Sequence, residues 1–269
     1  MNHQDTEKVK MSNHQDTKGT KKTIFGESFG KEMCGELRGR GYPVLEGIFD
    51  RQAQFMSRYD WTGKTVIELG AFDGRHSEVA LRLGAAFATV VEGRKENLKH
   101  ANPAWPEKVR FVVGDIREIL NHQDTEYTKE NQEGQGVIEP VDVGLIFGVL
   151  YHLDNPVRFL EKALTYCREA VFIWTHVAST INLECEGYAG MRYEDPGRSD
   201  NDALEPLTAF WFAWDELERC LRANGFRVVR IEGMRTPVTP SAEAVCVWAE
   251  RLNPKLEVPQ GNWLEVERR

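Results

Sequence analysis

Short apolar runs alternate with helix-like stretches along most of the chain. The runs are rich in Val, Ile and Phe and are bounded by polar or glycine residues, as buried strands are. They stand at residues 65–69, 88–92, 109–113, 142–147 and 170–174. Between them, apolar positions at helical spacing predict helices at about 74–83, 115–120 and 155–167. Strands that alternate with helices predict a parallel sheet with helices on both faces.

The end of the chain breaks this alternation. A predicted helix at 213–225 is followed by two strand-like runs, 226–234 and 243–251, with a turn-rich linker between them. Consecutive strands joined without a helix form an antiparallel pair, because a parallel connection needs a long crossover. We therefore predict an α/β fold with a mostly parallel sheet that ends in an antiparallel strand pair.

Two further patterns divide the chain. Apolar residues at helical spacing in 43–59 predict a helix ahead of the first strand. The pentamer NHQDT occurs at 2–6, 13–17 and 121–125 among polar residues. We interpret it as a duplicated coding element in tolerant segments rather than as a His-rich metal-binding sequence. The expected divisions are a disordered tail (1–22), an N-terminal helical cap (23–62), a main domain (63–251) with a surface loop (121–138) and an insertion (180–212), and a C-terminal arm (252–269).

Composition narrows the class of protein. A chain of 269 residues has room for one large α/β domain. Its 34 basic and 42 acidic residues give a net charge of −8, which argues against general binding to nucleic-acid phosphates. No apolar stretch approaches the roughly 20 residues that span a bilayer, and the polar N-terminus lacks a signal-peptide apolar core. Five scattered cysteines without a Cys-x-x-Cys pair fit reduced thiols, so we expect a cytoplasmic protein without membrane contact.

The first strand and the turn after it carry the clearest chemical signal. Glu68, Gly70 and Gly74 form a Glu-x-Gly-x-x-x-Gly pattern, with Asp73 in the turn. Glycines allow a sharp turn and close approach to a ligand, and the following helix directs its N–H groups toward that ligand. Nicotinamide enzymes use G-x-G-x-x-G here for a pyrophosphate. The carboxylates of Glu68 and Asp73 suit a cationic ligand better than a pyrophosphate.

Two more acids follow the next strands in order. Glu92 ends the second strand, where a carboxylate can accept both hydroxyls of an adenosine ribose. Asp115 follows the third strand and could accept a hydrogen bond from an adenine amino group. Each acid alone is ordinary after a strand, but the ordered set predicts a site for an adenosine-containing cofactor.

The sequence resembles the class I S-adenosylmethionine-dependent methyltransferases across roughly residues 60–250. The motifs are VIELGAFDG, VVEG, VVGDI and DVGLIFGVLYHL. The resemblance implies a Rossmann-like, seven-stranded sheet whose last strand pair is antiparallel, which agrees with the pattern above. It also implies S-adenosylmethionine (SAM) as cofactor, with Glu92 holding its ribose. The middle glycine of the usual first motif is Phe72 here, which we interpret as altered packing near the cofactor. The implied cofactor-binding residues are Glu68, Gly70, Phe72, Asp73, Gly74, Glu92, Gly93, Asp115, Ile116, Phe147, Gly148 and Val149.

The acceptor is expected beyond the same strand ends. Tyr151 and His152 follow the fourth strand, and His176 is expected just after the fifth, so either histidine is a candidate base or orienting group. The alternative is that both are hydrogen-bonded core histidines. We expect no metal, because no acid stands beside either histidine in a ligand-like pattern, and we expect His76 to face solvent or cap packing.

The insertion 180–212 has an unusual aromatic density for a segment that we expect not to form strands. It is interpreted either as a substrate lid or as a hydrophobic plug over the sheet edge. Its candidate substrate-binding residues are Arg192, Tyr193 and Trp211.

The expected activity is methyl transfer to an oxygen or nitrogen of a small organic acceptor in specialised metabolism, by a monomer or homodimer. GVLYH followed by Pro156, together with GYAGMRY, is also similar to the tRNA wobble-uridine carboxymethyltransferase group. That group uses a carboxylated cofactor and binds tRNA, so a cation such as Arg75, Arg94 or Arg192 would be needed near the methyl end. A non-catalytic partner protein that keeps the cofactor site is a third alternative, and a nicotinamide oxidoreductase is disfavoured by the glycine spacing.

Overall fold

The computed structural model describes residues 46–101, 103–120, 138–194, 208–239 and 242–252. The predictions for the tail, for nearly all of the surface loop and for the C-terminal arm after its first residue lie outside these residues. Within them, no helix is long and apolar enough to cross a membrane.

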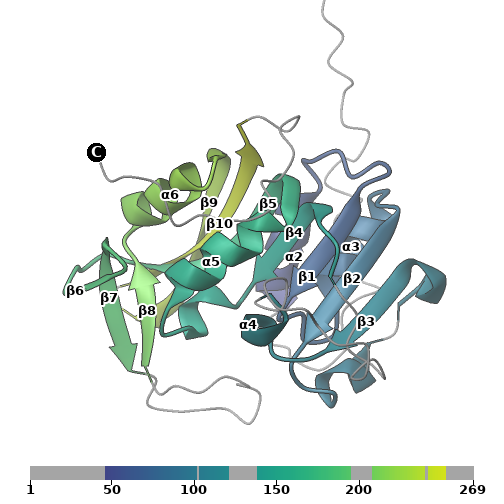
Figure 1. Cartoon of the computed structure of the whole chain (residues 1–269), viewed down its shortest axis with the longest axis horizontal. Coiled ribbons are helices and arrows are strands. Elements are labelled where there is room, and N and C mark those ends of the chain that lie inside the picture. The colour runs from purple at the N-terminus through teal and green to yellow at the C-terminus, as the bar shows by residue number, and fades with distance from the viewer. Residues whose placement is uncertain (1–45, 102, 121–137, 195–207, 240–241, 253–269) are drawn as a thin grey trace, which may run out of the picture.

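A seven-stranded sheet forms the centre of the molecule (Figure 1). Its order is β3-β2-β1-β4-β5-β10-β9, and β10 runs antiparallel to both of its neighbours while β1 to β5 are parallel. This confirms the predicted mostly parallel sheet with an antiparallel pair at its end. The strands are β1 (Thr65–Leu69), β2 (Phe87–Glu92), β3 (Val109–Val113), β4 (Val141–Phe147), β5 (Cys167–Ala178), β9 (Phe226–Thr239) and β10 (Ala242–Arg251).

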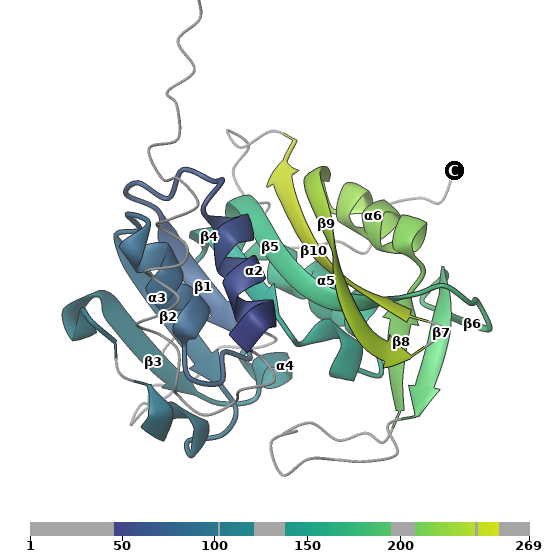
Figure 2. The ribbon, with the colours of Figure 1, turned by 180° about the vertical axis from the view of Figure 1, so that it is seen from behind.

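Helices cover both faces of the sheet, as predicted. Figure 2 shows α2 (Glu46–Met56) and α3 (Arg75–Arg82) on one face. The other face carries α4 (Ile116–Ile119), α5 (Pro156–Thr165) and α6 (Trp214–Ala223). Short 3₁₀ turns η1 (Asn97–His100), η2 (Pro106–Lys108) and η5 (Leu150–His152) complete the connections.

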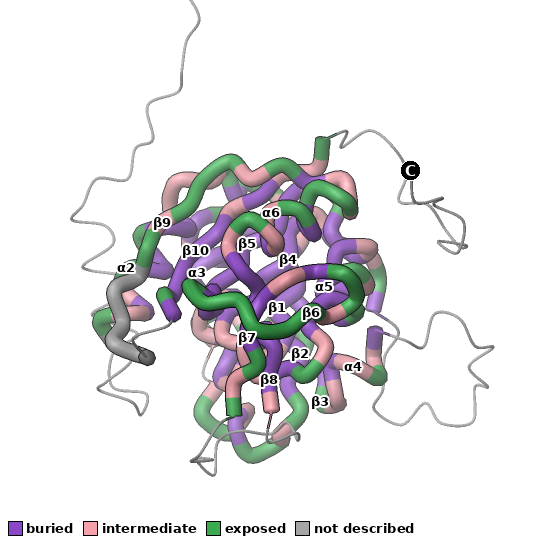
Figure 3. The backbone as a smooth tube through the Cα atoms, turned by 90° about the vertical axis from the view of Figure 1, so that its left-hand side faces the viewer, coloured by how far each residue is buried: buried purple, intermediate pink, exposed green. Residues whose placement is uncertain are grey.

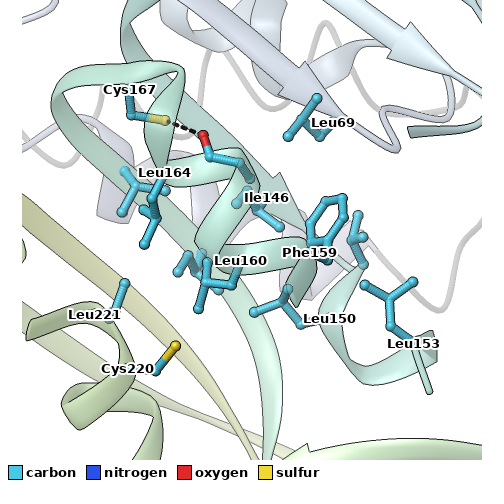
Figure 4. Packing of buried hydrophobic residues seen from close by; sticks show 14 of the residues in the cluster. Leu69, Ile146, Leu150, Leu153, Phe159, Leu160, Leu164, Cys167, Cys220 and Leu221 are labelled. Atoms are coloured by element: carbon cyan, nitrogen blue, oxygen red, sulfur yellow. Dashed lines mark hydrogen bonds between the residues drawn. The ribbon is translucent and has the colours of Figure 1, made fainter. Parts of the chain in front are cut away.

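Each face of the sheet has its own hydrophobic core, and buried residues run through the centre of the molecule (Figure 3). Leu160 and Leu164 of α5 pack in one cluster with Cys220 and Leu221 of α6 (Figure 4). The local signals agree with this packing. Asn155 caps α5 by accepting a hydrogen bond from the N–H of Arg158 at 3.1 Å. These cores hold the carboxyl ends of the parallel strands in fixed positions.

The segment after β5 corrects the prediction. Its described part forms a second, three-stranded antiparallel sheet of β6 (Leu183–Cys185), β7 (Tyr188–Glu194) and β8 (Thr208–Phe212), so the expectation of a non-strand segment is wrong. Phe210 and Phe212 of β8 join the core of α5 and α6, whereas Trp211 packs on the opposite side with Met191. Apolar side chains on both faces remove the apolar–polar alternation by which a strand is recognised.

The fifth strand is longer than predicted. β5 continues to Ala178 because β10 pairs with it over its whole second half, including His176 with Ala244. His176 therefore lies inside the strand, and the expectation that it follows the strand is wrong.

Candidate functional site

The turn from β1 into α3 lies against the end of β4. Gly70 has φ +68°, and a Cβ added to it would lie 2.6 Å from Cγ2 of Val149. Gly74 has φ +76° and caps α3, with Val90 3.3 Å from the place of its missing Cβ. Both glycines are therefore required by conformation and by close approach.

Phe72 occupies the place of the missing middle glycine in a glycine-like conformation. Its φ is +56°, a left-handed backbone that costs a non-glycine residue roughly 1–2 kcal/mol. Its N–H donates to Oε2 of Glu92 at 2.8 Å, and its ring stacks on His100 with centroids 6.4 Å apart. The substitution thus keeps the shape of the turn.

Glu92 is the buried carboxylate that holds the turn to the end of β2. Besides the N–H of Phe72, it accepts hydrogen bonds from the N–H of Arg94 at 2.9 Å and from Nδ2 of Asn97 at 3.0 Å. An ionised carboxylate has about four acceptor sites. Three protein donors therefore orient Glu92 and leave it further acceptor capacity.

Asp115 is the N-cap residue of α4 and follows the end of β3. It accepts from the N–H of Arg117 at 2.8 Å and pairs with that guanidinium, whose hydrogen bonds lower the pKa of the Asp115 carboxyl. The next residue, Ile116, is buried, and its Cδ1 lies 3.9 Å from the place of a Cβ on Gly70. The ends of β1, β3 and β4 therefore converge on one place.

Glu68 is bound within the protein and lies behind the turn. Its Oε2 accepts the N–H of Ser77 at 2.8 Å, and its Oε1 lies 2.9 Å from Nδ1 of His76. Nε2 of His76 lies 2.8 Å from Oε1 of Gln52 on α2, and the ring stacks on Phe147 at 4.3 Å. Of the two expectations for His76, facing solvent or capping packing, the first is wrong, because α2 closes over the ring.

Asp73 and Arg75 neutralise each other at the start of α3. Asp73 is buried and accepts from both Nε and Nη2 of Arg75, at 2.9 and 2.8 Å. Arg75 also lies 5.4 Å from the ring centroid of Phe49. This guanidinium therefore has a carboxylate partner inside the chain already.

The end of β4 connects the turn to a group of aromatic residues. Gly148 has φ +77°, and its N–H donates to the carbonyl of Trp174 at 3.0 Å. A Cβ on Gly148 would lie 3.4 Å from Cζ3 of Trp174 and 3.5 Å from the hydroxyl of Tyr151. Phe147 and Val149 on either side are buried.

Five side chains form what we call the aromatic cluster: Tyr151, Trp174, His176, Tyr193 and Trp211. Tyr151 stacks on His176 at 4.0 Å and Tyr193 stacks on Trp211 at 4.1 Å. The edge-on contact of His176 with Trp211 at 5.0 Å joins the two pairs. The indole N–H of Trp211 donates to the carbonyl of Tyr151 at 2.9 Å, so the small sheet is fastened to the turn after β4.

Two ring nitrogens of the aromatic cluster are buried without a hydrogen-bond partner in the part of the chain that the structure describes. They are Nδ1 of His176 and Nε1 of Trp174, on side chains that are 7 % and 8 % exposed. Burial, with a smaller contribution from His152, lowers the pKa of His176 from 6.5 to about 4. His176 is therefore uncharged at neutral pH.

The structure brings together most residues that the sequence singled out. His152 contacts Tyr151 at the edge of the aromatic cluster, with ring centroids 4.2 Å apart. Arg192 is exposed and belongs to the other side of β7 from Tyr193, while Gly93 is exposed near the end of β2. Sequence reasoning gave His76 no role at the site and did not single out Trp174, although Trp174 stands two residues before His176 and so shares its face of the strand. In the described ranges, no group of three or more His, Cys, Asp or Glu side chains is arranged to hold a metal.

Comparison with known proteins identifies the fold. No family model and no curated protein sequence matches the chain. The N-terminal domain of EvdMO1 with SAH bound is 17% identical with a TM-score of 0.58, over 85% of this chain and 98% of that one. Magnesium protoporphyrin IX methyltransferase from Synechocystis PCC 6803 with bound SAH is 12% identical with a TM-score of 0.53, over 84% and 95%.

A third solved structure, the Burkholderia thailandensis 1,6-didemethyltoxoflavin-N1-methyltransferase, is 18% identical with a TM-score of 0.52, over 84% of this chain and 86% of that one. At these identities the likeness concerns the fold. The chain has the Rossmann-like fold of the S-adenosylmethionine-dependent methyltransferases.

Proposed function

We propose that this chain is a SAM-dependent methyltransferase that acts on an oxygen or nitrogen of a small organic acceptor. The observation that carries the proposal is the convergence of the Gly70 turn, the Glu92 carboxylate and Val149 at adjacent strand ends. This convergence occurs in a fold that solved methyltransferases share.

The residues present fit SAM. The turn at Gly70 gives its backbone close approach because no Cβ intervenes. Glu92 keeps acceptor capacity for a ribose hydroxyl, and Ile116 beside Asp115 offers an apolar surface for a purine ring. Phe147, Gly148 and Val149 would form the wall on the side of β4.

Bound SAM supplies an activated methyl group, so the chain has to align the acceptor and handle its proton. The aromatic cluster touches Gly148 and therefore lies next to the proposed cofactor wall. We assign acceptor binding to this cluster, with the small sheet of β6, β7 and β8 acting as its cover. His152 and His176 are the candidate groups for proton removal or orientation.

Turnover with a panel of acceptors tests the activity. Pure protein is incubated with SAM and alcohols, phenols or amines, and S-adenosylhomocysteine (SAH) and methylated product are measured by mass spectrometry. We expect product with some panel members, a loss of at least tenfold in Glu92→Gln, and retention in Glu78→Gln. Glu78 is a matched control, because it is a buried acid paired with Arg82 on α3. Binding of SAH without turnover of any acceptor would instead support the non-catalytic partner.

The alternative is a tRNA-modifying (carboxy)methyltransferase. Its support is the motif resemblance and the fold of a putative RNA methyltransferase from Pyrococcus horikoshii, which is 19% identical with a TM-score of 0.50 over 83% of this chain and 98% of that one. The net charge of −8 and the engagement of Arg75 with Asp73 favour the small-molecule activity. Mass spectrometry of the co-purified cofactor separates the two, because a carboxylated SAM would support the alternative.

A further inference from the structure

The two unpartnered nitrogens of the aromatic cluster carry more information than their burial alone. Buried polar groups in folded proteins are almost always hydrogen-bonded, and leaving one without a partner costs roughly 1–3 kcal/mol. Trp174 and His176 place two such atoms on one face of β5, with ring centroids 5.8 Å apart. These two atoms lie next to the proposed cofactor wall at Gly148, where one bound ligand would satisfy both of them.

The chemistry of the pair defines the group that it can bind. An indole N–H only donates a hydrogen bond. The imidazole of His176 is neutral at neutral pH, so its Nδ1 can accept one. One donor beside one acceptor complements a hydroxyl, which accepts through its oxygen and donates through its hydrogen.

Charged acceptors fit the aromatic cluster poorly. A carboxylate or phosphate would lose its solvation among Tyr151, Trp174 and Trp211, and the neutral imidazole offers it no positive charge. An uncharged molecule avoids this cost. Both nitrogens are buried, so binding of its hydroxyl requires neighbouring side chains to shift, and the half-buried Tyr151 ring stacked on His176 is one of these neighbours.

We propose that Trp174 and His176 bind the hydroxyl of an uncharged acceptor and direct methyl transfer to its oxygen. This inference rests on the proposed function and narrows it from oxygen or nitrogen to oxygen. The indole N–H holds the acceptor oxygen, and Nδ1 of His176 holds the hydroxyl hydrogen.

The transfer step balances with these groups. The acceptor oxygen forms a bond to the methyl carbon, the carbon–sulfur bond breaks with its electron pair going to sulfur, and the hydroxyl proton moves to Nδ1 of His176. A hydroxyl oxygen becomes strongly acidic as it is alkylated, so even a weakly basic imidazole takes the proton late in the step. The proton then passes to solvent.

Trp248 provides a matched control for Trp174. Its Nε1 is also buried without a partner among the described residues, but its ring stacks on Phe172 of β5 at 5.7 Å and contacts Tyr59. Trp174→Phe and Trp248→Phe each remove one unpartnered N–H and keep an aromatic ring. A difference between them therefore reports ligand binding and not the loss of a buried polar atom.

The test follows the indole N–H resonances of ¹⁵N-tryptophan-labelled protein saturated with SAH. The resonances of Trp174 and Trp248 are assigned by the two variants, or by through-bond experiments on the unaltered chain where a variant does not fold. Phenol and cyclohexanol are added as uncharged hydroxyl probes, and benzoate and cyclohexanecarboxylate as matched carboxylates. We expect the hydroxyl probes to move the Trp174 resonance downfield and to leave that of Trp248 in place.

The same titration gives affinities. We expect Trp174→Phe and His176→Phe to weaken phenol binding about tenfold, and Trp248→Phe to leave it unchanged. A Trp174 resonance that no hydroxyl probe moves, or that benzoate moves equally, overturns the inference while SAH binding still supports the proposed function. Failure of SAH to bind overturns the proposed function itself.

Discussion

Nδ1 of His76 lies 2.9 Å from Oε1 of Glu68, and this contact joins the start of α3 to the first strand of the sheet. The other ring nitrogen lies 2.8 Å from Oε1 of Gln52 on α2. Glu68 in turn accepts the N–H of Ser77, so one carboxylate fixes both the histidine and the start of α3. The acid of the first motif therefore acts behind the turn, as a positioning residue for it.

His76→Phe should destabilise the protein by about 2–4 kcal/mol. The ring can still stack on Phe147, but Glu68 and Gln52 lose a buried partner. Urea denaturation measures the loss. His100→Phe is the control, because His100 is exposed and stacks on Phe72, and it should change stability by less than about 0.5 kcal/mol. Equal stability of the two variants would contradict a structural role for the His76 contacts.

Gly70→Ala should be more damaging than Gly63→Ala. Both glycines have positive φ, +68° and +72°, so both substitutions cost about 1–2 kcal/mol of backbone strain. Gly63 has nothing within 4 Å of its missing Cβ, whereas Gly70 faces Val149 at 2.6 Å. The clash should add about 1–3 kcal/mol.

Val149→Ala isolates that clash. Combined with Gly70→Ala, it should recover part of the lost stability, which a double-mutant cycle reports as a favourable interaction energy. Measuring the SAH affinity of the same four proteins tests whether the close contact between Gly70 and Val149 also affects cofactor binding. Strictly additive losses in both measurements would show that the turn and Val149 are not packed as described.

The unfolding free energy should fall as the pH drops from 6.5 toward 4. The pKa of His176 is about 4 in the folded protein and 6.5 when exposed, so the unfolded chain binds the proton first. The stabilisation of the folded protein that comes from this difference in pKa is fully present above pH 6.5. It is lost as the pH falls to about 4, and the total loss is about 3 kcal/mol. His176→Phe should flatten this part of the pH profile relative to His100→Phe. Parallel profiles would mean that His176 is not held neutral by burial.

The sequence predicted the features that depend on short stretches of chain. The parallel sheet follows from strand-like runs that alternate with helices, and its antiparallel end follows from two last strands that no helix separates. The positions of Gly70, Glu92 and Asp115 follow from their places after strands. These features need no knowledge of how distant segments pack.

The remaining features depend on distant contacts. His76 is buried because α2, more than twenty residues earlier in the chain, brings Gln52 over it. β5 is long because β10 pairs with its second half, and β7 and β8 are strands although both faces of β8 carry apolar residues. Trp174 and His176 lie on the same face of one strand, and this could be predicted only if β5 was known to continue past residue 174. Such relationships appear only when the packed chain is seen.

Titration calorimetry of SAH against the unaltered protein, Glu92→Gln and Glu78→Gln tests the central claim most directly. The replacement at Glu92 puts an amide N–H₂ among the N–H groups of Phe72 and Arg94 and removes the charge proposed to hold the ribose. The account predicts binding to the unaltered chain, at least tenfold weaker binding to Glu92→Gln, and unchanged binding to Glu78→Gln. No binding of SAH to the unaltered chain, or equal affinity in all three proteins, would contradict it.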